Sequence, residues 1–228
     1  MKKLKCFMSF VILLILISGC KTDQIIQPYH LLTENTCSFP CWMGITPGET
    51  PYAEVKDILE QLRQKFLEKN VTITIKELPM PGDHTPPYTY VEIPGSEIYI
   101  VRNIHKIVDE IRIYFVNTPT VSEFVQNYKA PDSIGICLGY SYAQPYLVYD
   151  GAQVLTRFEM PDYDSKTDLI TFENFCESRV NELFLVETPI FNHFDFTFSW
   201  EDMAQTVVID IKQTDPDSDC YGEFVPWK

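Results

Sequence analysis

The chain has 228 residues, of which 45% are hydrophobic and 14% aromatic, enough for one large buried core or two small ones. Its 32 acidic and 18 basic residues give a formal net charge of −14 at pH 7. This acidity argues against nucleic acid as a partner, because phosphates select basic surfaces, and against a chain that lies flat on an anionic membrane leaflet.

The N-terminus has the layout of an export signal. Residues 1–5 carry three lysines, residues 6–17 are apolar, and the small residues Ser18 and Gly19 precede Cys20. The apolar run is too short to remain in a bilayer as a permanent spanning helix. We therefore predict that residues 1–19 are removed as a signal peptide.

The four residues Ile17-Ser-Gly-Cys20 resemble the lipobox of bacterial lipoproteins. The resemblance implies that Cys20 is lipidated, with palmitate among its acyl chains, and becomes the first residue of a protein anchored on the extracytoplasmic side of a bacterial cell membrane or outer membrane. Several acyl chains on one residue anchor stably where a single chain does not. Residues 20–36 show no periodic pattern and are predicted to be a tether. The alternative is an ordinary secretory signal that happens to end in cysteine.

The exported chain keeps five cysteines besides the lipidated one, and an oxidising compartment favours disulfides among them. Cys37 and Cys41 are separated by three residues, whereas the thioredoxin-like redox motif has two. A zinc site would need further Cys or His at ligand spacing. We predict a structural disulfide that involves Cys37 or Cys41, within this loop or to another segment. A second predicted bridge joins Cys176 and Cys220.

The first half of the chain predicts one helix and four strands. Thr50 and Pro51 suit a helix N-cap and first helical residue, and apolar side chains then recur at helical spacing to residue 68. Strands are predicted at residues 71–76, 88–93, 96–101 and 107–116, with Pro94-Gly95 as a hairpin turn. The last strand places Ile107, Ile111, Ile113 and Phe115 on one face and Val108, Glu110, Arg112 and Tyr114 on the other.

The second half predicts a shorter helix and more strands. Thr120 and Glu123 have the spacing of a capping box that opens a helix at residues 120–130. A strand follows at 133–138, then a hairpin about Asp150-Gly151, an acidic loop at 160–168 and a strand at 180–187. Residues 168–178 suit either a strand or a helix. A last hairpin is predicted from residues 193–200 and 206–212.

One internal similarity suggests the organisation of the domains. Residues 108–119 and 180–189 match as the same strand-to-turn element, two residues shorter in the second copy. We therefore predict an α+β fold made of tandem helix plus antiparallel β-sheet units, at residues 37–117 and 118–187, with the helices packed on the sheets. Residues 188–228 would form a C-terminal β-hairpin and tail.

Two resemblances bear on this architecture. The stretch Gly44-Ile-Thr-Pro-Gly-Glu-Thr50 with Glu54-Val55 and, more loosely, residues 121–131 resemble the SmpA/OmlA-type outer-membrane assembly lipoproteins and the β-lactamase inhibitor protein. The segment Cys37-x-x-Pro-Cys-Trp-x-Gly-Ile-x-Pro-Gly48 is similar to a group of uncharacterised bacterial lipoproteins. The first resemblance implies a binding scaffold, and the second implies no activity. Lys129-Ala130 departs from the first pattern, which expects a glycine there.

The candidate catalytic pattern is weak. Gly139-Tyr-Ser141-Tyr-Ala143 approximates a nucleophile elbow, and Asp162 and His193 follow in the order of a serine hydrolase. The elbow requires a helix directly after the serine, whereas Gln144-Pro145 and a further strand follow here. We interpret the segment as a turn between strands and predict no catalytic residue.

The sequence predicts neither a metal site nor a cofactor. Asp215, Asp217 and Asp219 imitate the start of a calcium loop, but Cys220 stands where that loop needs glycine and Pro226 where it needs glutamate. The four histidines, His30, His84, His105 and His193, show no converging spacing. An aromatic strand, Phe194, Phe196, Phe198 and Trp200, could present a platform for sugar or peptide, but core packing is the more common use of such a pattern.

Two functions from different classes remain. The first is a non-catalytic binding module, whose ligand would be an envelope protein, a peptide or a glycan. The second is a cell-envelope hydrolase whose site is assembled only in three dimensions, with Ser141, His193 and the acidic loop as first suspects. A deep pocket in which histidine meets serine or carboxylates would favour the second.

Overall fold

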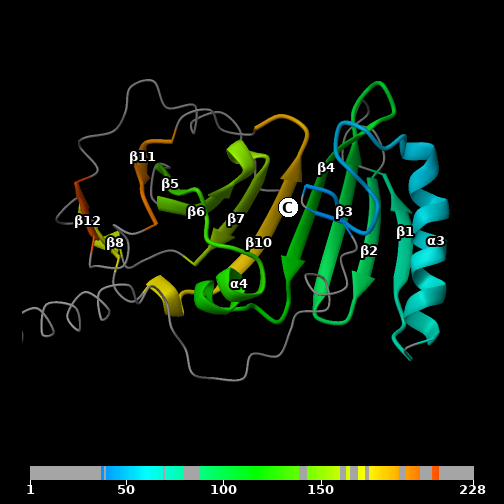
Figure 1. Ribbon diagram of the computed structural model, residues 1–228, viewed down its shortest axis with the longest axis horizontal. Coiled ribbons are helices and arrows are strands. Elements are labelled where there is room, and N and C mark those ends of the chain that lie inside the picture. The colour runs from blue at the N-terminus through cyan, green and yellow to red at the C-terminus, as the bar shows by residue number, and fades with distance from the viewer. Residues whose placement is uncertain are drawn as a thin grey trace, which may run out of the picture.

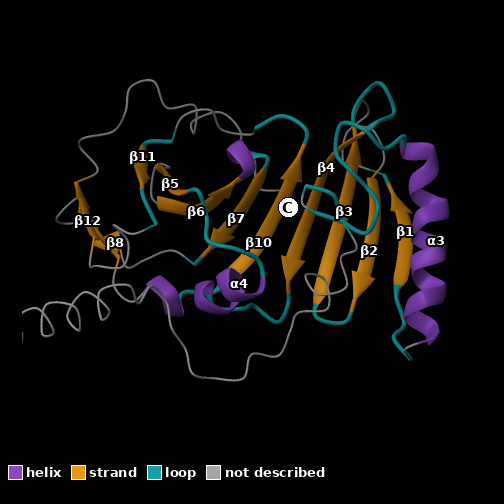
Figure 2. Ribbon diagram, viewed as in Figure 1, coloured by secondary structure: helices purple, strands orange, loops and turns teal. Residues whose placement is uncertain are grey.

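The large sheet dominates the fold. The structure is a computed structural model that describes residues 37–38, 40–68, 70–79, 88–138, 143–159, 163–164, 169–172, 175–189, 194–200 and 207–210. Nine strands form one antiparallel sheet in the order β1-β2-β3-β4-β10-β7-β6-β5-β11, and β12-β9-β8 form a separate small sheet (Figures 1 and 2).

The bounds of the elements are as follows. The large sheet consists of β1 (Thr74–Leu78), β2 (Tyr88–Ile93), β3 (Ser96–Arg102), β4 (Val108–Phe115), β5 (Ser133–Leu138), β6 (Ala143–Tyr149), β7 (Val154–Phe158), β10 (Val180–Val186) and β11 (Phe196–Phe198). The small sheet consists of β8 (Tyr163–Asp164), β9 (Leu169–Phe172) and β12 (Val207–Asp210). The helices are α3 (Tyr52–Glu68) and α4 (Val121–Asn127), with 3-10 turns η1 (Asp150–Ala152) and η2 (Phe175–Glu177).

The predicted α+β tandem of helix-plus-sheet units is wrong. Strands β4 and β10 pair side by side, with Ile113 opposite Leu183, so strands from both predicted units belong to one continuous sheet. The described residues contain only two α-helices, and the fold is mainly β. Pairing β4 with β10 satisfies backbone groups that two separate sheets would leave open at their edges. The matching segments 108–119 and 180–189 contain these two central strands.

One face of the large sheet carries the main core. Helix α3 lies beside β1 at one end of the sheet, and α4 lies near β7 and β10 (Figure 1). The predicted helical spacing is confirmed, because Val55, Leu59, Leu62 and Phe66 of α3 are buried. They share one cluster with side chains from β2 to β7, β10 and α4. The sheet and both helices thus bury a single apolar layer.

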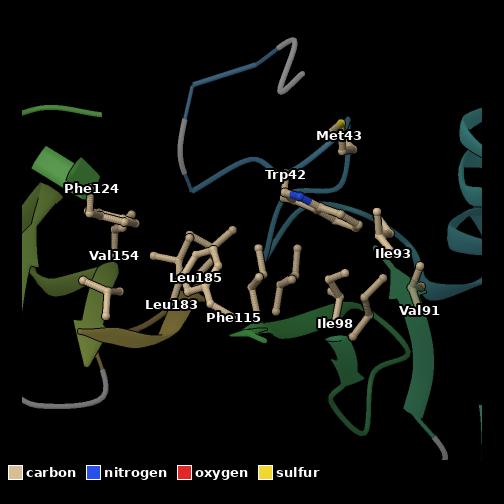
Figure 3. Packing of buried hydrophobic residues seen from close by; sticks show 14 of the residues in the cluster. Trp42, Met43, Val91, Ile93, Ile98, Phe115, Phe124, Val154, Leu183 and Leu185 are labelled. Atoms are coloured by element: carbon tan, nitrogen blue, oxygen red, sulfur yellow. The ribbon is translucent and has the colours of Figure 1, made fainter. Parts of the chain in front are cut away.

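A stapled loop closes the same face. Cys37 and Cys41 form a disulfide, which confirms the prediction of a structural bridge at this pair. Directly after the bridge, Trp42 and Ile45 exchange two backbone hydrogen bonds of 2.8 and 2.9 Å. Both side chains are fully buried, and Figure 3 shows Trp42 lying across the sheet next to Ile93.

Two further cysteines are oxidised. Cys137 and Cys176 each form a disulfide bond. Cys220 lies outside the described residues, so its pairing with Cys176 stays a prediction.

The capping box that opens α4 is confirmed. The Thr120 hydroxyl accepts a hydrogen bond from the Glu123 N–H, and the Glu123 carboxylate accepts one from the Thr120 N–H. The helix then ends earlier than predicted, at Asn127. Its short length is compensated by burial, since Val121 and Phe124 are completely enclosed.

Two local expectations need correction, and one open alternative is decided. A β-bulge pairs Val101 with Glu110 but Arg102 with Val108, which turns Val108 into the core instead of away from it. Residues 168–178 contain both the short strand β9 and the 3-10 turn η2. The predicted last hairpin does not form, because β11 pairs with β5 and β12 pairs with β9.

Candidate binding face

The face of the large sheet opposite the main core carries two kinds of surface. Over β5, β6 and β7 it is apolar and forms a second buried cluster: Cys137, Tyr146, Val148, Ala152, Leu155, Phe184 and Phe194. Phe194 lies directly on Gly135, since a Cβ atom added there would be 2.5 Å from its ring. This half of the face is therefore covered by the chain itself.

Over β2, β3 and β4 the same face is aromatic and charged. Strand alternation and the two-residue turn at Pro94-Gly95 fix which side chains become neighbours. One row across the sheet consists of Lys76, Tyr90, Tyr99, Arg112 and Phe184. The next row consists of Thr74, Glu92, Glu97, Tyr114, Glu182 and Arg157.

Four tyrosines form the centre of this surface, and we call them the tyrosine cluster: Tyr88, Tyr90, Tyr99 and Tyr114. The ring of Tyr99 lies 5.6 Å from that of Tyr88 and 5.3 Å from those of Tyr90 and Tyr114, measured between centroids. The last two contacts are edge-to-face, a favoured arrangement of aromatic pairs. All four residues are partly exposed, so the rings are packed against one another and still reach solvent.

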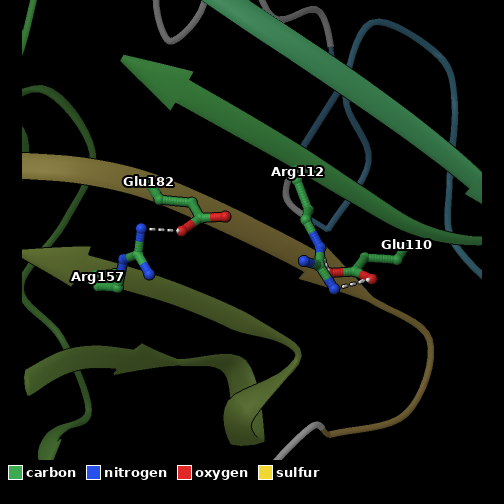
Figure 4. Close-up of polar contacts among 4 residues, drawn as sticks. All are labelled: Glu110, Arg112, Arg157 and Glu182. Carbon is green, nitrogen blue, oxygen red and sulfur yellow. Dashed lines mark hydrogen bonds and ion pairs between the residues drawn. The ribbon is translucent and has the colours of Figure 1, made fainter. Parts of the chain in front are cut away.

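Two ion pairs border the cluster on the side of β10 (Figure 4). Arg112 donates to both carboxylate oxygens of Glu110, the Nη2 bond being 3.0 Å. Arg157 contacts Glu182 at 2.7 Å. Burial alone would lower the pKa of Arg112, but the Glu110 carboxylate outweighs it, and the pKa of the guanidinium is raised. Arg112 thus stays charged, and it also lies over the Phe184 ring at 5.5 Å.

Burial and, after it, nearby carboxylates raise the pKa values of Tyr90, Tyr99 and Tyr114. Burial and then the Glu97 carboxylate raise the pKa of Tyr99 to about 12. Burial followed by Glu182 raises that of Tyr114. The Tyr99 hydroxyl donates to Glu97 over 3.3 Å. The hydroxyls therefore remain protonated donors at neutral pH.

Glu182 gives this surface a testable pH dependence. Its side chain is 2% exposed, and burial raises its pKa against the opposing effect of Arg157. A raised carboxyl pKa means that the folded chain holds the proton more tightly than the unfolded chain, where the pKa is about 4.3. The resulting stabilisation is complete below that pH and is lost as the pH rises through the higher folded-state value.

Replacing Glu182 by glutamine removes this titration. We expect the free energy of unfolding of Glu182→Gln, relative to the wild type, to rise as the pH increases from about 4, and then to level off. Urea unfolding at a series of pH values measures the difference. Glu68→Gln, an exposed change on α3, reports the effect of removing one acidic charge alone. The expectation is contradicted if the free energy of unfolding of Glu182→Gln, relative to the wild type, stays constant or falls as the pH rises.

Most of the residues that the sequence singles out for possible chemistry are not among those that the structure describes. The following residues lie outside the described part of the chain: Ser141, Asp162, His193, His30, His84, Cys20 and the aspartates at 215, 217 and 219. Strand β6 begins at Ala143 and pairs with β5, so the polypeptide that follows Ser141 is a strand and not the helix of a nucleophile elbow. His105 is exposed in the turn between β3 and β4.

The aromatic side chains of residues 194–200 divide between two clusters. Phe194 belongs to the second cluster, whereas Phe196, Phe198 and Trp200 pack against the main core. The tyrosine cluster was not foreseen. Its signal in the sequence was the Tyr-Thr-Tyr alternation at residues 88–90, read together with the turn that sets Tyr90 opposite Tyr99.

The described residues contain neither a metal-ligand cluster nor a membrane-spanning helix. Within the described ranges, no three His, Cys, Asp or Glu side chains gather as metal ligands would. No helix among the same residues has the length and apolarity needed to cross a membrane. Comparison of the chain with family models, with curated proteins and with solved structures found no match.

Proposed function

We propose that this protein is an extracytoplasmic, lipid-anchored binding protein without catalytic activity, and that it contacts its partner through the tyrosine cluster. The observation that carries the proposal is the contrast between the two halves of one sheet face. The half over β5, β6 and β7 forms a buried apolar cluster that includes Phe194, whereas the half over β2, β3 and β4 presents four partly exposed tyrosines. Tyrosine is enriched in protein interfaces, because it supplies large contact area and a hydrogen-bonding group at low cost in side-chain entropy.

The anchoring part of the proposal rests on the Ile17-Ser-Gly-Cys20 segment. Mass spectrometry of the mature protein from its native membrane should find a chain that begins at an acylated Cys20. Cys20→Ala should be released from the membrane or be misprocessed. An unmodified Cys20, or a mature chain that begins elsewhere, would refute the anchor without affecting the tyrosine cluster.

The binding part is tested by comparing variants in a cross-linking capture from the native envelope. The test variant is Tyr99→Ala with Tyr114→Ala, and the control is Gln61→Ala with Gln64→Ala on the exposed side of α3. We expect a partner that is captured by the wild type and the control and lost with the test variant. Equal thermal unfolding of the variants excludes misfolding as the cause. A partner captured equally by all three would overturn the assignment of the tyrosine cluster.

A further inference from the structure

Two carboxylates on the tyrosine-bearing face lie directly opposite each other on neighbouring strands. Glu92 of β2 and Glu97 of β3 are direct cross-strand partners, and Glu92 is exposed while Glu97 is partly exposed. Among the described residues, neither forms an ion pair, although Glu97 accepts the Tyr99 hydroxyl. Like charges directly opposite each other destabilise a sheet. A cation bound between them would relieve this repulsion.

The aromatic rings beside these carboxylates suit a cation as well. A Lys or Arg group is attracted to the face of a tyrosine ring within about 6 Å of its centroid. This surface already contains two such contacts, Lys76 over Tyr90 at 5.8 Å and Arg112 over Phe184 at 5.5 Å. Tyr99 lies between them in the same row and, within the described part of the chain, has no cation over its ring.

The remaining charges leave the surface acidic. Glu110 pairs with Arg112, and Glu182 pairs with Arg157, so these four side chains offset one another. Of the charged residues in the two rows, only Lys76 then remains to offset the two negative charges of Glu92 and Glu97. The whole chain is also negatively charged, with a formal net charge of −14 at pH 7. Charge complementarity therefore favours a basic ligand over a neutral glycan or an acidic one.

Building on the proposed function, we propose that the tyrosine cluster binds a basic segment of a partner protein, with a Lys or Arg side chain lying over Tyr99 between Glu92 and Glu97. The rings supply contact area, and the two carboxylates select the cation. The same carboxylates destabilise the unoccupied sheet. Residues that favour a ligand at the expense of the free fold are typical of a binding site.

The test uses synthetic peptides and the full mature protein in detergent, with affinity measured by isothermal titration. The probe is a peptide of alternating lysine and alanine, and its matched control carries acetylated lysines. We expect the lysine peptide to bind, and Glu92→Gln with Glu97→Gln to weaken binding about tenfold or more. Glu54→Gln with Glu68→Gln, exposed on α3, removes the same net charge and should leave the affinity unchanged.

The outcomes separate this inference from the proposed function. If the α3 control weakens binding equally, or if the acetylated peptide binds as well, the cation site is refuted. Binding that is lost in Tyr99→Ala but kept in Glu92→Gln with Glu97→Gln would also refute it, while the tyrosine cluster would stand as a binding surface. The cation site would also be refuted if the lysine peptide does not bind. The tyrosine cluster would still stand as a binding surface if capture of an envelope partner depends on Tyr99 and Tyr114. The double glutamine variant should unfold at a temperature no lower than that of the wild type.

Discussion

Replacing Trp42 by alanine is expected to lower the free energy of unfolding by about 3–5 kcal/mol, the usual cost of deleting a large buried aromatic side chain. Trp42 is completely buried, and it comes from a short stapled loop whose neighbours have little freedom to fill the space. Its removal also takes away the packing of that loop beside Ile93 of β2 (Figure 3). Chemical denaturation followed by circular dichroism gives the difference.

Leu67→Ala is the matched control for this change. Leu67 is a large apolar residue of α3, but it is 47% exposed. Its truncation should change the free energy of unfolding by less than about 0.5 kcal/mol, as for most surface substitutions. A loss below about 1 kcal/mol for Trp42→Ala would show that the stapled loop contributes little to the core.

Replacing Gly135 by alanine should destabilise the fold by about 1–3 kcal/mol through overpacking. The backbone of Gly135 does not adopt a positive φ, so alanine causes no backbone strain there. The cost is a steric clash, because the new methyl group would lie 2.5 Å from the Phe194 ring. Phe194 would have to leave its place in the second cluster. Equilibrium unfolding in urea measures this cost.

A double-mutant cycle identifies Phe194 as the cause. In a Phe194→Ala background the added methyl group meets no ring, so Gly135→Ala should cost much less there than in the wild type. The coupling would confirm that Phe194 packs on Gly135 at the second face of the sheet. Equal costs in both backgrounds would contradict the packing of Phe194 on Gly135.

Local signals in the sequence predicted local structure well. The apolar spacing of α3, the Thr120 capping box, the Pro94-Gly95 turn and the short-range disulfide each depend on residues close in the chain, so their physics is visible in a short stretch. The amphipathic stripe of α3 is an example, because each of its buried positions follows from a helical repeat that needs no knowledge of the sheet.

Long-range pairing was not visible in the same way. Nothing in β4 specifies that its free edge will meet β10, and two separate units satisfy the same hydrophobic pattern. The bulge between Val108 and Glu110 reverses the direction of the Val108 side chain by inserting one residue, which alternation alone cannot show. The tyrosine cluster depends on the same information, since Tyr90 and Tyr114 both meet Tyr99 only after the register of three strands is set.

The pairing of β4 with β10 has a consequence for the order of folding. Residues 110–114 find their partners at 182–186, so the middle of the sheet is completed by a contact between distant parts of the chain. Such contacts form slowly, because a long loop must close before they bring any gain. During synthesis from the N-terminus, β4 is made long before β10. Its bare edge is then a template for pairing with other chains, and arrival of β10 removes that hazard.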